Sequence, residues 1–188
     1  MHMGKTAVML ADGFEEIEGL TVVDILRRGG IETVMVSIMG RLAVVSSHDI
    51  EVKADILLEE LDFAEVDMIV LPGGLKGKEN LENCVPLMEK VDEFHAKGKY
   101  VAAICAAPTI LGHRGILQGR KAGCYGGMED QLTGAKVSFD KVSVDGHVIT
   151  SRGMGTSVAF ALRLLALLAD EKSADEMAAK IMYTDDWK

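Results

Sequence analysis

The sequence predicts a doubly wound α/β sandwich, in which helices cover both faces of a mostly parallel sheet. Short apolar runs at 5–10, 66–71 and 100–104 are continuous rather than alternating, which indicates strands buried on both faces. Segments with helical spacing of apolar residues lie between the runs, as in chains that build parallel sheets. No linker of biased composition interrupts the pattern, so we expect one domain.

The elements can be assigned in order along the chain. The first strand, 5–10, precedes a helix at 15–28 that has acids in its first turn, arginines in its last and Gly29-Gly30 after it. The further strands expected are 31–38, 66–71 and 100–104, with short strands or a hairpin in 41–53. The further helices expected are 81–97, a small-residue helix at 106–112, a buried helix at 156–169 and an amphipathic segment at 174–182. A hairpin joins 136–144 to 147–150 through Asp145-Gly146, and residues 183–188 are expected to fray.

Composition restricts the partners. A net charge of -9 argues against electrostatic binding to nucleic acid or to an anionic membrane. Small molecules or proteins are therefore the expected partners. The longest apolar stretch, 158–169, is shorter than the roughly 20 residues that cross a bilayer. The start of the chain has no apolar signal core, and three widely spaced cysteines form no disulfide framework, so a reducing cytoplasm is expected. We expect the domain to span residues 3–188, with Met3 as a candidate natural start and the origin of residues 1–2 left open.

Cys105 stands between the apolar run Tyr100–Ile104 and the expected small-residue helix. At such a turn the free N–H groups and the dipole of a helix N-terminus stabilise a thiolate, the reactive form of cysteine. The alternative is that Cys105 is a small core residue, as many free cysteines are. The segments 11–14, 72–74 and 151–153 also follow expected strands, and the carboxyl ends of parallel strands share one edge of a sheet. Their convergence favours a functional Cys105.

A carboxylic acid and two backbone segments would complete this site. Beside a thiolate in a dry pocket, Glu18 would keep its proton and shuttle it during turnover. The alternative is that Glu18, like Glu15 and Glu16, is a favourable first-turn acid. Gly73-Gly74 would bring bare backbone N–H groups near a substrate oxygen and, with the N–H of Ala106, form an oxyanion hole.

The other chemically active residues carry weaker signals. Gly153-x-Gly155 lacks the third glycine of a dinucleotide fingerprint, so nucleotide binding is rejected. Tyr125 is a candidate for the pocket wall, whereas Cys84 and Cys124 are interpreted as structural. No histidine neighbours Cys105, and each is interpreted as a surface or packing residue: His48, His95, His113 and His147.

Four ordered motifs carry a resemblance to a known family. They are Glu15-Glu16-Ile17-Glu18, Leu71-Pro72-Gly73-Gly74, Ala102-Ala103-Ile104-Cys105-Ala106-Ala107-Pro108 and Thr150-Ser151-Arg152-Gly153-Met154-Gly155-Thr156-Ser157. Together they resemble the ThiJ/PfpI superfamily, and more narrowly the branch of the Parkinson-disease-associated protein deglycase and its bacterial relatives. The resemblance covers about residues 5–168, whereas residues 170–188 match less clearly.

The resemblance implies a flavodoxin-like sandwich and a homodimer, with the helix around Ile17 and Arg28 as a contact surface. It further implies a nucleophilic Cys105 on a strained elbow, a protonated Glu18 beside it, and Gly74 with Ala106 as oxyanion donors. The residues expected to line the pocket are Glu15, Gly73, Tyr125, Gly153 and Met154, with no metal. Activities reported in that branch are cofactor-free conversion of methylglyoxal to lactate, deglycation, and oxidation of the cysteine to a sulfinate.

The sequence departs from the family pattern in several places. The protease branch has histidine after the cysteine, but here that position is Ala106, so a protease would lack its base. Human-like relatives have histidine, arginine and proline where Tyr125, His48 and Met154 stand, which leaves the pocket wall and any contribution of a second subunit open.

The leading hypothesis is therefore an enzyme in which the Cys105 thiolate attacks a small aldehyde such as methylglyoxal. The alternative is a redox-sensing or chaperone-like stress protein whose Cys105 is oxidised to the sulfinate. A relative that keeps the fold without activity is a third hypothesis.

Overall fold

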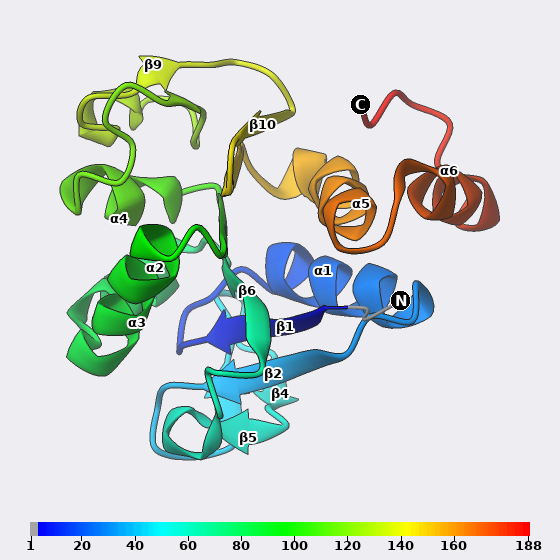
Figure 1. Ribbon diagram of the computed structural model, residues 1–188. Coiled ribbons are helices and arrows are strands. Elements are labelled where there is room, and N and C mark those ends of the chain that lie inside the picture. Colours follow the sequence, from blue (N-terminus) through cyan, green and yellow to red (C-terminus); the bar gives the residue numbers. More distant parts are fainter. Residues whose placement is uncertain (1–3) are drawn as a thin grey trace.

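Seven strands form the central sheet of the computed structural model, which describes residues 4–188 (Figure 1). Across the sheet the order is β10 (Val142–Asp145), β11 (Val148–Ser151), β7 (Tyr100–Ile104), β6 (Val66–Leu71), β1 (Lys5–Leu10), β2 (Thr33–Ser37) and β5 (Ile56–Leu57). All neighbours are parallel except β10, which runs antiparallel to β11. The parallel core therefore has the flavodoxin order 2-1-3-4-5, and the predicted fold class is confirmed. The candidate start at Met3 and residues 1–2 lie outside the described residues.

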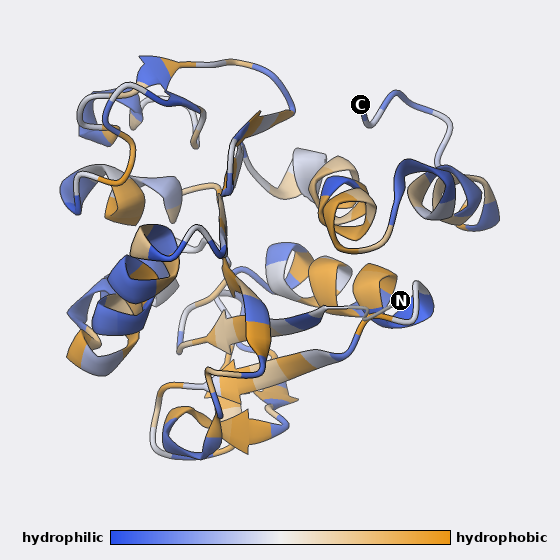
Figure 2. Ribbon diagram, viewed as in Figure 1, coloured by the Kyte–Doolittle hydropathy of each residue, from blue (hydrophilic) through white to orange (hydrophobic). Residues whose placement is uncertain are grey.

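Helices cover both faces of this sheet (Figure 1). On one face lie α1 (Glu16–Arg28), α5 (Ser157–Leu168) and α6 (Glu171–Lys180); on the other lie α2 (Leu75–Asn83), α3 (Val85–Ala96) and α4 (Pro108–His113). Figure 2 shows apolar colour concentrated on the strands and polar colour on the outer sides of helices such as α3 and α6.

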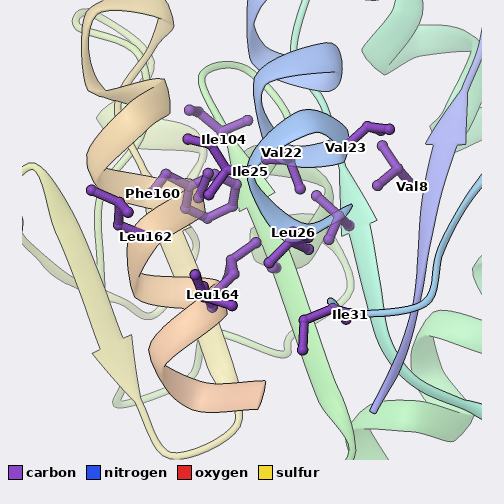
Figure 3. Close-up of a cluster of buried hydrophobic side chains, with 14 of the residues drawn as sticks. Val8, Val22, Val23, Ile25, Leu26, Ile31, Ile104, Phe160, Leu162 and Leu164 are labelled. Carbon is purple, nitrogen blue, oxygen red and sulfur yellow. The ribbon is translucent and has the colours of Figure 1, made fainter. Parts of the chain in front are cut away.

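Alternate strand residues fill two separate cores. Val8 and Ile104 face α1 and α5, where they pack with Val22, Leu26 and Phe160 (Figure 3). The strand residues that alternate with this first set, such as Met9 and Ala103, point to the opposite face and pack against α3 and α4. Both sets are fully buried, which explains why the strands read as continuous apolar runs. No helix within residues 4–188 combines the length and the apolar character needed to cross a membrane.

Several short strands and turns lie outside the seven-stranded sheet. A hairpin of β3 (Ala43–Val45) and β4 (Glu51–Lys53) confirms the expectation for 41–53. A two-stranded parallel pair, β8 (Lys121–Ala122) and β9 (Lys136–Val137), lies beyond β10, and single 3-10 turns occupy Leu58–Glu60, Glu129–Gln131 and Met154–Thr156.

The structure corrects three of the expected elements. The helix predicted over 81–97 is two helices that meet at Cys84, where Pro86 occupies the first turn of α3 and cannot donate a helical hydrogen bond. The small-residue helix begins at Pro108 rather than at 106, because residues 105–107 form a turn. The strand predicted over 136–144 is interrupted between β9 and β10, and two-residue strands such as β5 and β8 are too short to leave a pattern.

The C-terminal segment was expected to fray but packs against the domain. Trp187 is 5% exposed, and its Nε1 donates to Asp175 Oδ1 at 3.2 Å. The Arg163 guanidinium of α5 lies 5.0 Å above the indole ring. The expectation was wrong because one aromatic side chain anchors a segment that otherwise looks polar and irregular.

Replacing this anchor should destabilise the domain. Trp187→Ala is expected to lower the free energy of unfolding by about 3 kcal/mol, because a buried aromatic side chain is lost. Urea unfolding of the variant measures the change. Met182→Ala, at a side chain that is 81% exposed, is the control and should change stability by less than about 0.5 kcal/mol. Equal effects of both changes would show that the tail does not stabilise the fold.

Candidate active site

The site forms where the chain leaves neighbouring strands in opposite directions. β1 and β6 pair side by side, but the chain after β1 enters α1 on one face and the chain after β6 enters α2 on the other. Such a switch point opens a crevice at the carboxyl ends of the strands. The loops after β1, β6, β7 and β11 all reach this edge, so the predicted convergence is confirmed (Figure 1).

Cys105 occupies a strained elbow at the end of β7. Its φ of 65° lies in the left-handed region, which costs a non-glycine residue of the order of 1 kcal/mol or more. Two hydrogen bonds hold the elbow: Cys105 N donates to Ser151 O at 3.0 Å, and Tyr125 N donates to Cys105 O at 2.8 Å. The strained conformation is thus fixed from β11 on one side and from the Tyr125 loop on the other.

The first turn of α1 places Glu18 beside Cys105. Glu15 caps the helix, its Oε2 accepting from Glu18 N at 2.7 Å. The Glu18 side chain is 1% exposed; its Oε2 accepts from Gly73 N at 2.9 Å, and its carboxyl group lies beside the Cys105 side chain. Within residues 4–188, Glu18 Oε1 has no hydrogen-bond partner. A buried carboxylate with one N–H donor is poorly solvated, so the arrangement favours the protonated acid.

Gly73 is required at the centre of this contact. A methyl group at residue 73 would overlap Glu18 Oε2 and Cys105 Cβ, and it would press against the carbonyl oxygen of Ile104. The absence of a side chain therefore allows the acid, the thiol and the end of β6 to meet.

The pKa values of the Glu18 carboxyl group and the Cys105 thiol are both raised above their usual values. Burial raises the pKa of Glu18 to about 7, and the nearby charge of Glu15 adds to the effect. Burial, followed by the negative charge of Glu18, raises the pKa of the Cys105 thiol to about 12. Because each negative charge opposes the other, the pair carries one negative charge after losing its first proton near neutral pH.

The raised thiol pKa differs from the sequence-based expectation. That expectation relied on the N-terminus of the helix after Cys105, but α4 begins three residues later and has six residues. The groups that lower the pKa of Cys105 are instead the backbone N–H groups of Gly74 and Ala106, which hydrogen-bond to the sulfur. These are the two predicted oxyanion donors, and their effect on the thiol pKa places both N–H groups near the Cys105 sulfur.

Cys105 opens into a cavity of about 620 Å³. Of the predicted site residues, Glu15, Gly74, Ala106 and Tyr125 line it with Cys105, whereas Glu18 and Gly73 lie in its buried floor. Gly153 and Met154 line a neighbouring cavity of about 360 Å³ that shares Tyr125 and Gly126 with the first. Sequence reasoning missed Leu75, Gly126 and Met128 in the wall and left the role of His48 open. Leu75 was missed because an exposed apolar residue after a glycine turn carries no chemical signal.

Cys124 and three of the histidines have hydrogen-bond partners other than Cys105. Cys124 is buried, its Sγ donates to Tyr125 O at 3.3 Å, and burial raises its pKa to about 11. His95 and His147 hydrogen-bond to each other at 2.9 Å, and His113 pairs with Glu82.

Among residues 4–188, one group of side chains has the donor atoms to hold a metal ion. Ligand atoms of Glu15, Glu16 and His48 lie within 4.8 Å of one another. Each has a protein partner already: Glu15 accepts from Glu18 N, and Glu16 Oε1 lies 2.7 Å from His48 Nδ1. The group is therefore a hydrogen-bonded acidic cluster at the cavity rim.

Comparison with known proteins places this geometry in context. A family model described as the DJ-1/PfpI family matches residues 4–167. Protein dj-1beta of Drosophila melanogaster is 36% identical over 183 residues, covering 96% of this chain and 98% of the relative. A protein of Pyrococcus abyssi named as a deglycase is 32% identical over 166 residues, covering 87% of this chain and 99% of the relative.

Longer relatives and solved structures also match. Protein DJ-1 homolog B of Arabidopsis thaliana is 36% identical over 180 residues, and this chain spans 41% of its length. The structure of oxidized DJ-1 of Toxoplasma gondii superposes with a TM-score of 0.93 at 34% identity, covering 97% of this chain and 100% of that chain.

The buried acid should make stability depend on pH. Because the folded pKa of Glu18 is raised, its protonated form stabilises the fold at low pH, and this contribution is lost as the pH rises through about 7. Between pH 4.5 and 7.5, the wild type should lose about 3 kcal/mol of unfolding free energy relative to Glu18→Gln, which cannot ionise. Urea unfolding across this range measures the difference.

An exposed glutamate provides the control. Glu89→Gln, on the outer face of α3, should follow the wild-type pH profile. Parallel profiles for the wild type and Glu18→Gln would mean that Glu18 does not hold a proton in the folded protein at neutral pH.

Proposed function

The chain belongs to the DJ-1/PfpI family, and we propose that it is a cofactor-independent cysteine enzyme acting on small reactive aldehydes such as methylglyoxal. The observation that carries the proposal is the contact between a buried carboxyl group and a strained cysteine at the floor of an open cavity. The relative named as a deglycase supports an activity on aldehydes or their adducts. The free cysteines fit a reducing compartment, and the cytoplasm is the proposed location.

The reactive form is the one in which Glu18 holds the proton and Cys105 the negative charge. After the pair loses its first proton, transfer of the remaining proton from sulfur to carboxylate creates the thiolate. The N–H groups of Gly74 and Ala106 stabilise the charged sulfur in this form.

The proposed chemistry needs water but no oxidant or reductant. Cys105 Sγ attacks the aldehyde carbon of methylglyoxal, a C–S bond forms, and the new alkoxide takes a proton from Glu18. The Glu18 carboxylate then accepts the proton of that carbon and returns it to the neighbouring carbon, while the hydroxyl proton on the first carbon moves to the oxygen of the second. The product is a lactoyl thioester. Water breaks the C–S bond, releases lactate and restores the thiol.

The oxyanion donors suit this sequence of steps. The alkoxide forms on the carbon bonded to sulfur, so it develops close to the N–H groups that already point at the sulfur. Fixed donors of this kind stabilise a developing charge without reorganisation.

A second copy of the chain is the proposed partner. Ile17 on α1 is 47% exposed, and a shallow hollow near it has a mixed lining. Its apolar residues are Leu20, Ile25, Val158 and Ile181, and its polar residues are Thr21, Asp24, Arg28 and Lys180. An apolar centre with charged groups of both signs around it supports a symmetric dimer through α1.

The enzymatic proposal predicts a strict requirement for the nucleophile. Cys105→Ala should lower lactate formation from methylglyoxal at least 10³-fold, and Glu18→Gln should lower kcat by roughly 10²-fold or more because proton transfer is lost. Cys84→Ala, at the junction of α2 and α3, is the control and should retain the wild-type rate.

Two results would contradict the proposal. Full activity of Cys105→Ala would exclude the nucleophile. Absence of lactate formation by the wild type, with selective peroxide oxidation of Cys105, would instead support the redox-sensing alternative.

The dimer proposal has its own test. Light scattering should give twice the chain mass for the wild type, and Ile17→Glu should shift the protein to the monomer, because a charge would be buried in the interface. Ile50→Glu, at an exposed residue that is not part of the α1 hollow, is the comparison. A monomeric wild type at micromolar concentration would refute the dimer.

A further inference from the structure

Arg152 lies next to the nucleophile in the sheet. It follows β11 directly, and the residue before it, Ser151, accepts the hydrogen bond from Cys105 N. β7 and β11 are parallel neighbours, so Cys105 and Arg152 emerge from adjacent strands at the same edge.

Arg152 differs from the other arginines in its surroundings. The arginines that pair with a carboxylate are Arg27, Arg28, Arg41, Arg114, Arg120 and Arg163. Within residues 4–188, Arg152 forms no such pair, and its buried Nε has no acceptor. An unpaired guanidinium is unexpected in a protein of net charge -9, where carboxylates outnumber cations.

A cation–π contact limits the movement of the guanidinium. Its Cζ lies 5.2 Å from the centre of the Phe139 ring. This contact uses no hydrogen-bond donor, so the N–H groups of the guanidinium keep their capacity to donate.

Arg152 lines the second cavity, together with Gly153, Met154, Gly155 and Thr156. No acidic side chain contributes to that lining, and the cavity shares Tyr125 and Gly126 with the Cys105 cavity. The two cavities are therefore adjacent, with Cys105 in one and a cation without a carboxylate partner in the other, and together they are called the two-part cleft.

The opposite charges of the two parts of the cleft favour one orientation of a ligand that has a carboxylate at one end and an aldehyde at the other. The Glu18–Cys105 pair carries a negative charge near neutral pH and repels a carboxylate, whereas Arg152 attracts one and can bind it through two parallel hydrogen bonds. We propose that the Arg152 cavity binds the carboxylate of a small oxoaldehyde whose aldehyde group reacts with Cys105. This inference deepens the proposed function and rests on it for the reaction at sulfur; the product would be a 2-hydroxy acid with a second carboxylate.

The test compares a charged and a neutral substrate of matched length. 4,5-Dioxopentanoate carries a carboxylate at the end remote from its aldehyde, and 2-oxopentanal has a methyl group there. The wild type should have a higher kcat/KM for 4,5-dioxopentanoate, and Arg152→Gln should lower the ratio of the two kcat/KM values about 10- to 100-fold, the effect of one charge-assisted pair. Arg114→Gln, which removes the same charge from a paired arginine on the far side of the sheet, should leave the ratio unchanged.

A second readout does not require turnover. Pentanoate should slow the alkylation of Cys105 by iodoacetamide, and pentanamide at the same concentration should not. Arg152→Gln should abolish the difference, and Arg152→Lys, which keeps the charge without the planar fork, should weaken it.

The outcomes distinguish a failure of the carboxylate site from a failure of the proposed enzymatic function. Turnover of both aldehydes at equal kcat/KM, with equal protection by pentanoate and pentanamide, would overturn the carboxylate site and leave the proposed function standing. No turnover of either aldehyde, with protection by pentanoate alone, would overturn the proposed function and support the site. The wild-type comparison decides the site even if Arg152→Gln fails to fold.

Discussion

The contact among Glu18, Gly73 and Cys105 is the constraint on which the rest of the site depends. It joins the first turn of α1, the end of β6 and the end of β7, three segments that belong to different parts of the chain. The contact forms only because residue 73 has no side chain and because Cys105 accepts a left-handed conformation. The sheet order brings these strand ends together beside the switch point between β1 and β6, so that the glycine and the left-handed cysteine meet at the same place.

The electrostatics of the site follow from that contact. A thiol that stood alone near two backbone N–H donors would be favoured as a thiolate, but here burial and Glu18 raise its pKa. The same burial raises the pKa of Glu18, so neither group ionises independently of the other. The position of the one shared proton, on sulfur or on the carboxyl oxygen, is therefore sensitive to small changes in hydrogen bonding.

Much of this arrangement could be predicted from the sequence because its signals are local. Continuous apolar runs identified β1, β6 and β7, and the loops after them were expected to converge. The direction of the Cys105 pKa could not be predicted, because it depends on how deeply Glu18 and the sulfur are buried together. Arg152 stands inside a recognised motif, but the proposal for it rests on a missing carboxylate partner and on the neighbouring Phe139 ring, which are long-range properties. The packing of Trp187 was missed for the same reason.

Under the proposed function, the two-part cleft would orient a small ligand that makes few contacts with the protein. A neutral aldehyde would meet mainly Cys105, the N–H donors and the wall around Tyr125. A ligand with an anion at its far end meets opposite charges at its two ends: the negative pair repels the anion and Arg152 attracts it, so one orientation is favoured over the reverse. Orientation of this kind places the electrophilic carbon at the sulfur before any bond forms, which lowers the entropic part of the barrier. Under the proposed function, selectivity among aldehydes would depend on Arg152, and the chemistry would depend on Glu18 and Cys105.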